Sequence, residues 1–124
     1  MAKRFTLGKS ERLKSRKSIE QLFRSGTSFT LLPFRVTYQP ATEGLQFGVG
    51  VSSRYFKKAV DRNRIKRLTR EAYRIQKIPL QELLVANSKG LHVFFNYVSK
   101  EKTNYSIIAA AMEKSLIRLI NIIK

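Results

Sequence analysis

The spacing of apolar residues predicts four helices along the chain. An i, i+3, i+4 apolar face over residues 15–26 predicts the first helix, which begins near Ser15 or Ser18 and ends at Gly26. A long helix is predicted over residues 58–76, and a short helix over residues 79–86 has a proline in its first turn. The last helix begins near residue 103 or 104, runs to about 123, and turns a stripe toward the core, formed by Ile108, Ala111, Met112, Leu119 and Ile122.

Alternating residues predict strands between these helices. Residues 28–39 are rich in aromatic and β-branched side chains and contain Pro33, which favours one long bent strand or two short ones. Residues 40–44 are typical of a turn. Residues 45–52 alternate apolar with small or polar positions, the pattern of a strand with one buried face, and residues 91–98 form a further strand.

These elements predict an α+β fold, in the order α-β-β-β-α-β-α or close to it. We expect a single-domain α-β sandwich over residues 1–124, with one central sheet, helices packed on it, and residues 1–10 as a flexible basic N-terminus. The segment from residue 45 to 98 reads as a βαβ unit. If its strands are parallel neighbours, the general rule predicts a right-handed crossover.

The distribution of charge changes the picture most. The chain has 25 Lys+Arg against 8 Asp+Glu, a formal net charge of +17, and residues 1–24 and 54–74 hold 17 of those 25 cations. Such clustering favours a polyanionic partner over a generally cationic surface. The absence of cysteine excludes disulfides and thiolate metal sites. Without a secretory signal pattern or a long apolar run, we expect a cytoplasmic protein with no membrane association.

The helix over residues 58–76 concentrates this charge on one side. At about 100° per residue, Arg62, Lys66, Arg70, Arg74 and Arg67 share one side with Asn63 in its middle. The opposite side is an apolar stripe, predicted to pack on the sheet: Ile65, Leu68, Ala72 and Ile75. The alternative is a solvated basic face with Asn63 as a bystander. Clustered cations repel one another, however, and a phosphate backbone relieves that repulsion.

A sequence signature covers the same helix. Residues 47–53 read FGVGVSS, and residues 57–74 read KKAVDRNRIKRLTREAYR. The pattern K-A-V-x-R-N-R-x-K-R-x-x-R-E resembles the signature of the bacterial ribonuclease P protein component. The resemblance extends to residues 12–26, to the strand over residues 91–97 and to the last helix, so it spans nearly the whole chain.

The resemblance implies the non-catalytic protein subunit of a ribonucleoprotein endoribonuclease. Proteins of this family assist a catalytic RNA that removes the 5′ leader of precursor tRNA, with Mg²⁺ held mainly by the RNA. We expect a monomeric protein, one per RNA. The resemblance also implies a left-handed βαβ crossover in place of the right-handed one.

The resemblance further assigns residues to two sites. Contacts with the catalytic RNA are expected from Arg54, Lys57, Lys58, Arg62, Asn63, Arg64, Lys66, Arg67, Arg70 and Arg74. The 5′ leader is expected in a cleft between the first helix and the sheet, lined by Lys14, Arg16, Ile19, Phe23, Phe34 and Val36, with Tyr38 depending on strand register. Phe23 is a candidate for stacking on a base, with core packing as the alternative. Ile19 stands where an aromatic residue is common in the family.

The residues themselves contain no plausible active site. His92 is the single histidine, so a two-histidine mechanism is excluded, and the acids show no close pair of the kind that holds two metal ions. Two other functions stay open: a ribosomal protein or general RNA chaperone, and a self-sufficient ribonuclease, which requires catalytic side chains that we cannot locate. No catalytic residue and no metal ligand from the protein is therefore predicted.

Overall fold

The computed structural model describes residues 11–42 and 44–124, and its elements follow the predicted order. They are α1 (Arg16–Ser25), β1 (Thr27–Leu31), β2 (Phe34–Ala41), β3 (Leu45–Val51), α2 (Ala59–Gln76), α3 (Ile78–Ala86), β4 (Gly90–Tyr97) and α4 (Tyr105–Ile123). The α+β prediction is confirmed, and residues 28–39 form two strands joined at Leu32 and Pro33. The prediction for residues 1–10 lies outside the described residues.

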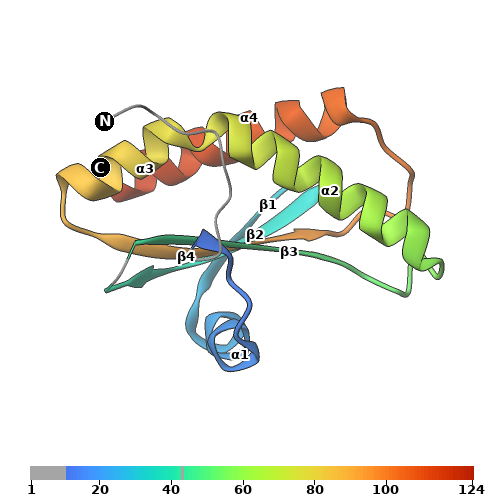
Figure 1. The fold of residues 1–124 in the computed structure, drawn as a ribbon, viewed down its shortest axis with the longest axis horizontal. Helices are drawn as coiled ribbons and strands as arrows, with labels where there is room; N and C mark the ends of the chain where they lie inside the picture. Colours follow the sequence, from blue (N-terminus) through green and yellow to red (C-terminus); the bar gives the residue numbers. More distant parts are fainter. Residues whose placement is uncertain (1–10, 43) are drawn as a thin grey trace.

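One mixed sheet in the order β1-β2-β4-β3 organises the molecule. β1 and β2 are antiparallel, as are β2 and β4, whereas β3 and β4 are parallel neighbours, as the βαβ interpretation required. Helices α2, α3 and α4 cover one face of the sheet, and α1 lies against the other (Figure 1). The hand of the crossover between β3 and β4 stays a prediction from the resemblance.

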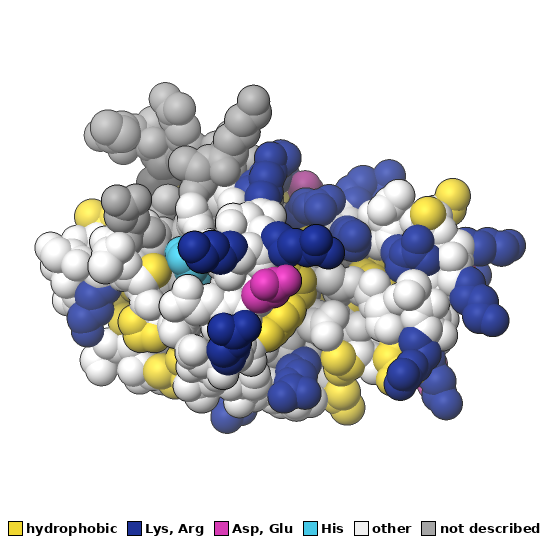
Figure 2. Space-filling view, turned by 90° about the horizontal axis from the view of Figure 1, so that it is seen from below, with side chains coloured by type: hydrophobic (Ala, Val, Ile, Leu, Met, Phe, Trp, Pro, Cys, Tyr) yellow, Lys and Arg dark blue, Asp and Glu magenta, His cyan; other side chains and the backbone are white. Residues whose placement is uncertain are grey.

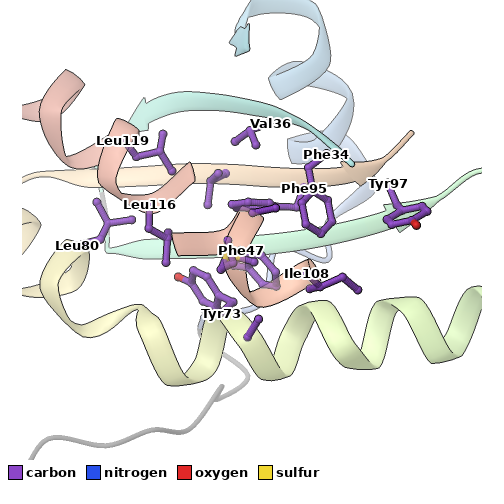
Figure 3. Packing of buried hydrophobic residues seen from close by; sticks show 14 of the residues in the cluster. Phe34, Val36, Phe47, Tyr73, Leu80, Phe95, Tyr97, Ile108, Leu116 and Leu119 are labelled. Atoms are coloured by element: carbon purple, nitrogen blue, oxygen red, sulfur yellow. The ribbon is translucent and has the colours of Figure 1, made fainter. Parts of the chain in front are cut away.

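The core lies between the sheet and the layer formed by α2, α3 and α4. Phe34 and Phe95 come from the sheet, Ile108 and Leu116 from α4, and all four are buried (Figure 3). Across the layers, the rings of Phe47 and Tyr73 stack with 3.9 Å between centroids and 5° between planes. Burial of this cluster is the main favourable term in folding.

The buried stripe of α2 is rotated from the predicted one, and the predicted stripe of α4 is wrong at one position. On α2, Ile65 and Ala72 are buried as predicted, but Thr69 and Tyr73 join them while Ile75 is 43% exposed. On α4, Ile122 is 45% exposed, although the rest of its predicted stripe is buried. Both misplaced isoleucines lie in the last turn of their helix. The buried stripe of α2 is therefore turned by about 60° from the predicted one.

One of the two predicted starts of the first helix is confirmed, whereas the predicted turn after β2 is displaced. Ser15 caps α1, because its hydroxyl accepts from the backbone N–H of Ser18, which itself lies inside the helix. β2 continues through Pro40, which pairs with Leu91, so the predicted turn over residues 40–44 is shorter than expected. Asn104 caps α4 by accepting from the N–H of Ile107, as predicted.

A buried ion pair fastens the start of the described chain to the helical layer. Lys77, at the junction of α2 and α3, is 1% exposed and its ammonium group donates to the carboxylate of Glu11. Beside this pair, the N–H of Leu13 donates to the carbonyl of Phe47 at 2.8 Å. The segment around residues 11–13 thus covers part of β3, one of the two edge strands of the sheet.

Replacing Tyr73 with phenylalanine is expected to stabilise the protein by about 1 kcal/mol. Within the described residues, its hydroxyl is the one buried side-chain polar atom without a hydrogen-bond partner, and desolvating such a group is costly. Burial, together with the negative charge of Glu11, raises the pKa of this hydroxyl, so it stays neutral. Urea unfolding measures the change.

The matched control is Tyr97→Phe. The Tyr97 hydroxyl donates to the carbonyl of Glu101 at 2.7 Å, so its removal is expected to lower the free energy of unfolding by about 1 kcal/mol. A loss of stability in Tyr73→Phe similar to that in the control would contradict the packing described for Tyr73.

Candidate RNA interface

The solvent side of α2 carries the signature residues as a continuous polar surface. We call this surface the α2 basic face; its exposed members are Asn63, Arg64, Arg67 and Arg70. Lys66 and Arg74 flank it and are half-buried. The opposite side of the helix packs on β3 and α4 through Ile65, Thr69 and Ala72. The core therefore fixes the orientation in which this face meets solvent.

Two arginines of the signature are held by the protein itself. One terminal nitrogen of Arg62 donates to the carbonyls of Phe56 and Lys57, both at 2.7 Å. One terminal nitrogen of Arg64 donates to the carbonyl of Thr103 at 3.0 Å. Arg62 thus ties the loop before α2 to the helix, and Arg64 ties α2 to the segment before α4. Each guanidinium has further N–H groups beyond these bonds.

Arg74 has an acidic neighbour on the same helix. Its guanidinium forms a two-pronged ion pair with Glu71, and both side chains are half-buried. Hydrogen bonding from Arg74 holds the pKa of Glu71 below its usual value, and the same bond raises the pKa of Arg74. Because Glu71 balances part of its charge, Arg74 is a weaker candidate for a phosphate contact than Arg67 or Arg70.

The loop between β3 and α2 extends the basic surface. Arg54, Lys57 and Lys58 are exposed there, as their predicted role requires. Phe56 is buried beside Tyr97, with 5.9 Å between ring centroids, whereas Tyr55 is 41% exposed. Phe56 therefore anchors the loop in the core.

A second surface lies on the other side of the sheet, where α1 packs. We call it the open face; alternation and strand register assign to it Arg35, Thr37, Gln39, Gln46, Gly48, Gly50, His92, Phe94 and Asn96. Seen from this side, apolar side chains are surrounded by many Lys and Arg (Figure 2).

An aromatic pair forms the apolar centre of the open face. Phe23 of α1 is 51% exposed and meets Phe94 of β4 edge to face, with 5.0 Å between ring centroids. A β-carbon at Gly48 or Gly50 would lie 2.7 or 2.9 Å from the Phe94 ring, so only glycine lets this ring lie against β3. An aromatic pair with one exposed ring is a candidate stacking platform for bases.

The structure corrects part of the predicted leader cleft. Lys14 is exposed just before α1, Arg16 is exposed at the first position of α1, and Ile19 is half-buried on the same helix. Phe34 and Val36, however, are fully buried on the helical side of the sheet, and Tyr38 shares their side of β2. Their predicted place in the cleft is wrong, because the apolar positions of β2 complete the core.

Phe94 was not predicted as a residue of the open face, although one feature of the sequence indicates its place there. β4 is apolar on both sides around this position, so alternation alone does not separate Phe94 from the core residues Val93 and Phe95. The alternating glycines of β3 were the available sign, since two glycines on one side of a strand leave room for a large neighbour.

Within the described residues, no three His, Asp or Glu side chains gather as a metal site. Partial burial lowers the pKa of His92, which keeps its imidazole neutral near pH 7. No helix in the described part of the chain is long and apolar enough to cross a membrane. The two surfaces present cations, amides and aromatic rings.

A basic helix face on one side of a single mixed sheet and an aromatic pair on the other are the two distinctive surfaces of this small α+β protein. The chain belongs to the ribonuclease P protein family, whose model matches residues 7–120. It is 40% identical over 119 residues to the ribonuclease P protein component of Porphyromonas gingivalis, a match that covers 93% of this chain and 87% of the relative.

More distant relatives share the family and the fold. The ribonuclease P protein component of Legionella pneumophila is 31% identical over 88 residues, covering 70% of this chain and 77% of the relative. The solved ribonuclease P protein of Thermotoga maritima superposes with a TM-score of 0.70 at 24% identity, covering 87% of this chain and 96% of that protein. That of Staphylococcus aureus gives 0.69 at 20% identity, covering 94% and 100%.

Proposed function

We propose that this chain is the protein subunit of ribonuclease P and assists the removal of the 5′ leader from precursor tRNA. It binds the catalytic RNA through the α2 basic face and the preceding loop, and it binds the leader along the open face. The catalytic groups and the Mg²⁺ ions belong mainly to the RNA. The observation that carries the proposal is the exposed set Asn63, Arg67 and Arg70, held outward by a helix whose other side is core.

Cleavage of a precursor tRNA at low, near-physiological Mg²⁺ tests this proposal. The reactions contain the cognate catalytic RNA alone, the protein alone, and the two together. Efficient release of the mature 5′ end by the mixture alone is the expected result. Cleavage by the protein alone would identify a self-sufficient ribonuclease, and a protein that adds nothing to the RNA would leave only general RNA binding.

Substitutions in the aromatic pair test the proposed binding of the 5′ leader. Phe23→Ala and Phe94→Ala are each expected to weaken holoenzyme binding of precursor tRNA about tenfold, because stacking on an aromatic ring contributes about 1–3 kcal/mol per base. Binding of mature tRNA, which has no leader, is expected to stay unchanged. Equilibrium binding of both RNAs to the assembled holoenzyme measures the difference.

The control for these variants is Val85→Ala. Val85 is an apolar side chain of α3 that is 75% exposed and lies on the other layer of the fold. It should alter neither affinity. Equal losses for precursor and mature tRNA in Phe23→Ala would remove this residue from the leader contact.

A further inference from the structure

A pocket with a volume of about 300 Å³ lies between the start of α2 and the connection from β4 to α4. Because β3 and β4 are parallel neighbours, the segments that follow these two strands meet at the same end of the molecule (Figure 1). The volume is at the lower end of the roughly 300–1,000 Å³ typical of small-ligand sites, and it is sufficient for one nucleobase. The pocket is lined by Phe56, Asp61, Arg64, Ile65, Lys102 and Thr103.

Two arginines of the signature hold the walls of this pocket. Arg62 donates to the carbonyl of Phe56 at 2.7 Å and fixes the wall that precedes α2. Arg64 donates to the carbonyl of Thr103 at 3.0 Å and fixes the wall that precedes α4. The hydroxyl of Tyr97 fastens the same connection, because it donates to the carbonyl of Glu101 at 2.7 Å. The pocket is therefore preformed, and little of it has to become ordered when a ligand binds.

Among the described residues that line the pocket, Asp61 is the one acid. It is half-buried in the first turn of α2, and within residues 11–42 and 44–124 its side chain forms no hydrogen bond or ion pair. A negative charge there stabilises the first turn of a helix, which is its ordinary structural role. The pocket adds two cationic donors, Arg64 and Lys102, and the apolar side chains of Phe56 and Ile65.

This combination of groups matches one nucleobase better than the others. The Watson–Crick edge of guanine offers two adjacent donors, N1–H and N2–H, which a single carboxylate accepts together. The O6 atom beside them accepts from a cation such as Lys102 or Arg64. Adenine, cytosine and uracil place an acceptor beside their donor on that edge, so the carboxylate of Asp61 repels it. The same carboxylate also repels a phosphate group.

We infer that this pocket takes an unpaired guanine of the catalytic RNA and that Asp61 recognises its Watson–Crick edge. The inference rests on the proposed function, and it adds a base-specific contact to the phosphate contacts of the α2 basic face. The pocket adjoins that face, because Arg64 belongs to both. It also lies on the helical side of the sheet, opposite the open face that is proposed for the leader. Arg62 and Arg64 then act as positioning residues for the pocket walls.

The first test is the sign of the effect of Asp61→Asn on binding of the cognate catalytic RNA by the full-length protein. Removing a negative charge from a basic protein should by itself strengthen its binding to RNA. The variant is instead expected to bind about tenfold more weakly, because the amide replaces one of two acceptors with a donor. The control is Glu113→Gln, which removes the same charge from an exposed position on α4 and should tighten binding by less than about twofold.

The second test identifies the base with inosine, which lacks the exocyclic amino group of guanosine. Catalytic RNAs in which inosine replaces each unpaired guanosine in turn should show one position where wild-type affinity falls about fivefold. Asp61→Asn should be insensitive to inosine there. Adenosine at that position should weaken the wild-type protein about tenfold but bind Asp61→Asn more tightly than guanosine does, because an amide pairs with the adjacent donor and acceptor of adenine. A purely structural role in the first turn of α2 cannot exchange one base preference for another.

The outcomes separate this inference from the proposed function. If the protein binds and activates the catalytic RNA but no guanosine is sensitive to inosine, or if Asp61→Asn keeps the same sensitivity, the pocket does not read guanine and the subunit function stands. Sensitivity confined to guanosines of the precursor tRNA, measured in parallel with the holoenzyme, would overturn the assignment to the catalytic RNA. If the protein neither binds nor activates that RNA, both ideas fail. The inosine series on the wild-type protein does not depend on the folding of any variant.

Discussion

Glu11→Ala is expected to lower the free energy of unfolding by about 3–5 kcal/mol. The substitution leaves the ammonium group of Lys77 without its carboxylate, in a position that is 1% exposed. Removing one member of a buried ion pair costs more than the pair itself contributes, because the remaining charge has lost water on folding. Urea unfolding followed by circular dichroism measures the loss.

The double variant Glu11→Ala/Lys77→Met distinguishes this cause from a loss of packing. Methionine fills the space of the lysine stem without a charge, so the double variant is expected to recover most of the stability. The thermodynamic cycle through both single variants then gives the coupling between the two side chains. A cost below about 1 kcal/mol for Glu11→Ala would show that Lys77 finds water or another partner in solution.

Arg67→Ala/Arg70→Ala is expected to weaken binding of the catalytic RNA about 30-fold at 0.15 M salt. For each phosphate contact, the logarithm of the binding constant changes with the logarithm of the salt concentration with a slope of roughly −0.9. Each lost contact therefore lowers the affinity by a factor of about 5 at 0.15 M salt. The slope of log affinity against log salt should therefore fall by about 2. Both arginines are exposed on the α2 basic face, so their loss should leave the fold intact.

A control for net charge is Lys89→Ala/Lys114→Ala. These lysines are also exposed, and their removal subtracts the same two charges from the turn before β4 and from α4. A loss of less than about threefold is expected. If both double variants lose affinity equally, the RNA responds to the overall charge of the protein, and the assignment of the α2 basic face as the contact surface is wrong.

The elements of the fold could be predicted because their apolar periods are long and their ends carry recognisable caps. Asn104 and Pro79 mark helix starts through chemistry that is local to a few residues. The strand order could not be derived in the same way, because pairing between β2 and β4 joins residues far apart in sequence. The ion pair of Glu11 and Lys77 spans 66 residues and leaves no local pattern.

The same distinction between local patterns and long-range contacts applies to the candidate site. The exposed signature residues of α2 could be predicted, since one helix period fixes their common side. Alternation showed that Phe34 and Val36 share a side of β2, but not that this side lies beneath three helices. The Phe23–Phe94 contact joins a helix to a distant strand, so no short stretch of sequence contains it.

Side chains alternate between the two sides of the sheet, so substitutions on one side affect the core and substitutions on the other affect the surface. Along β4, Val93 and Phe95 are core residues, while His92, Phe94 and Asn96 between them face outward. A mutation at an outward position changes what the open face can recognise without disturbing the packing that supports it. The lining of this surface can therefore change in evolution while the scaffold beneath it stays the same.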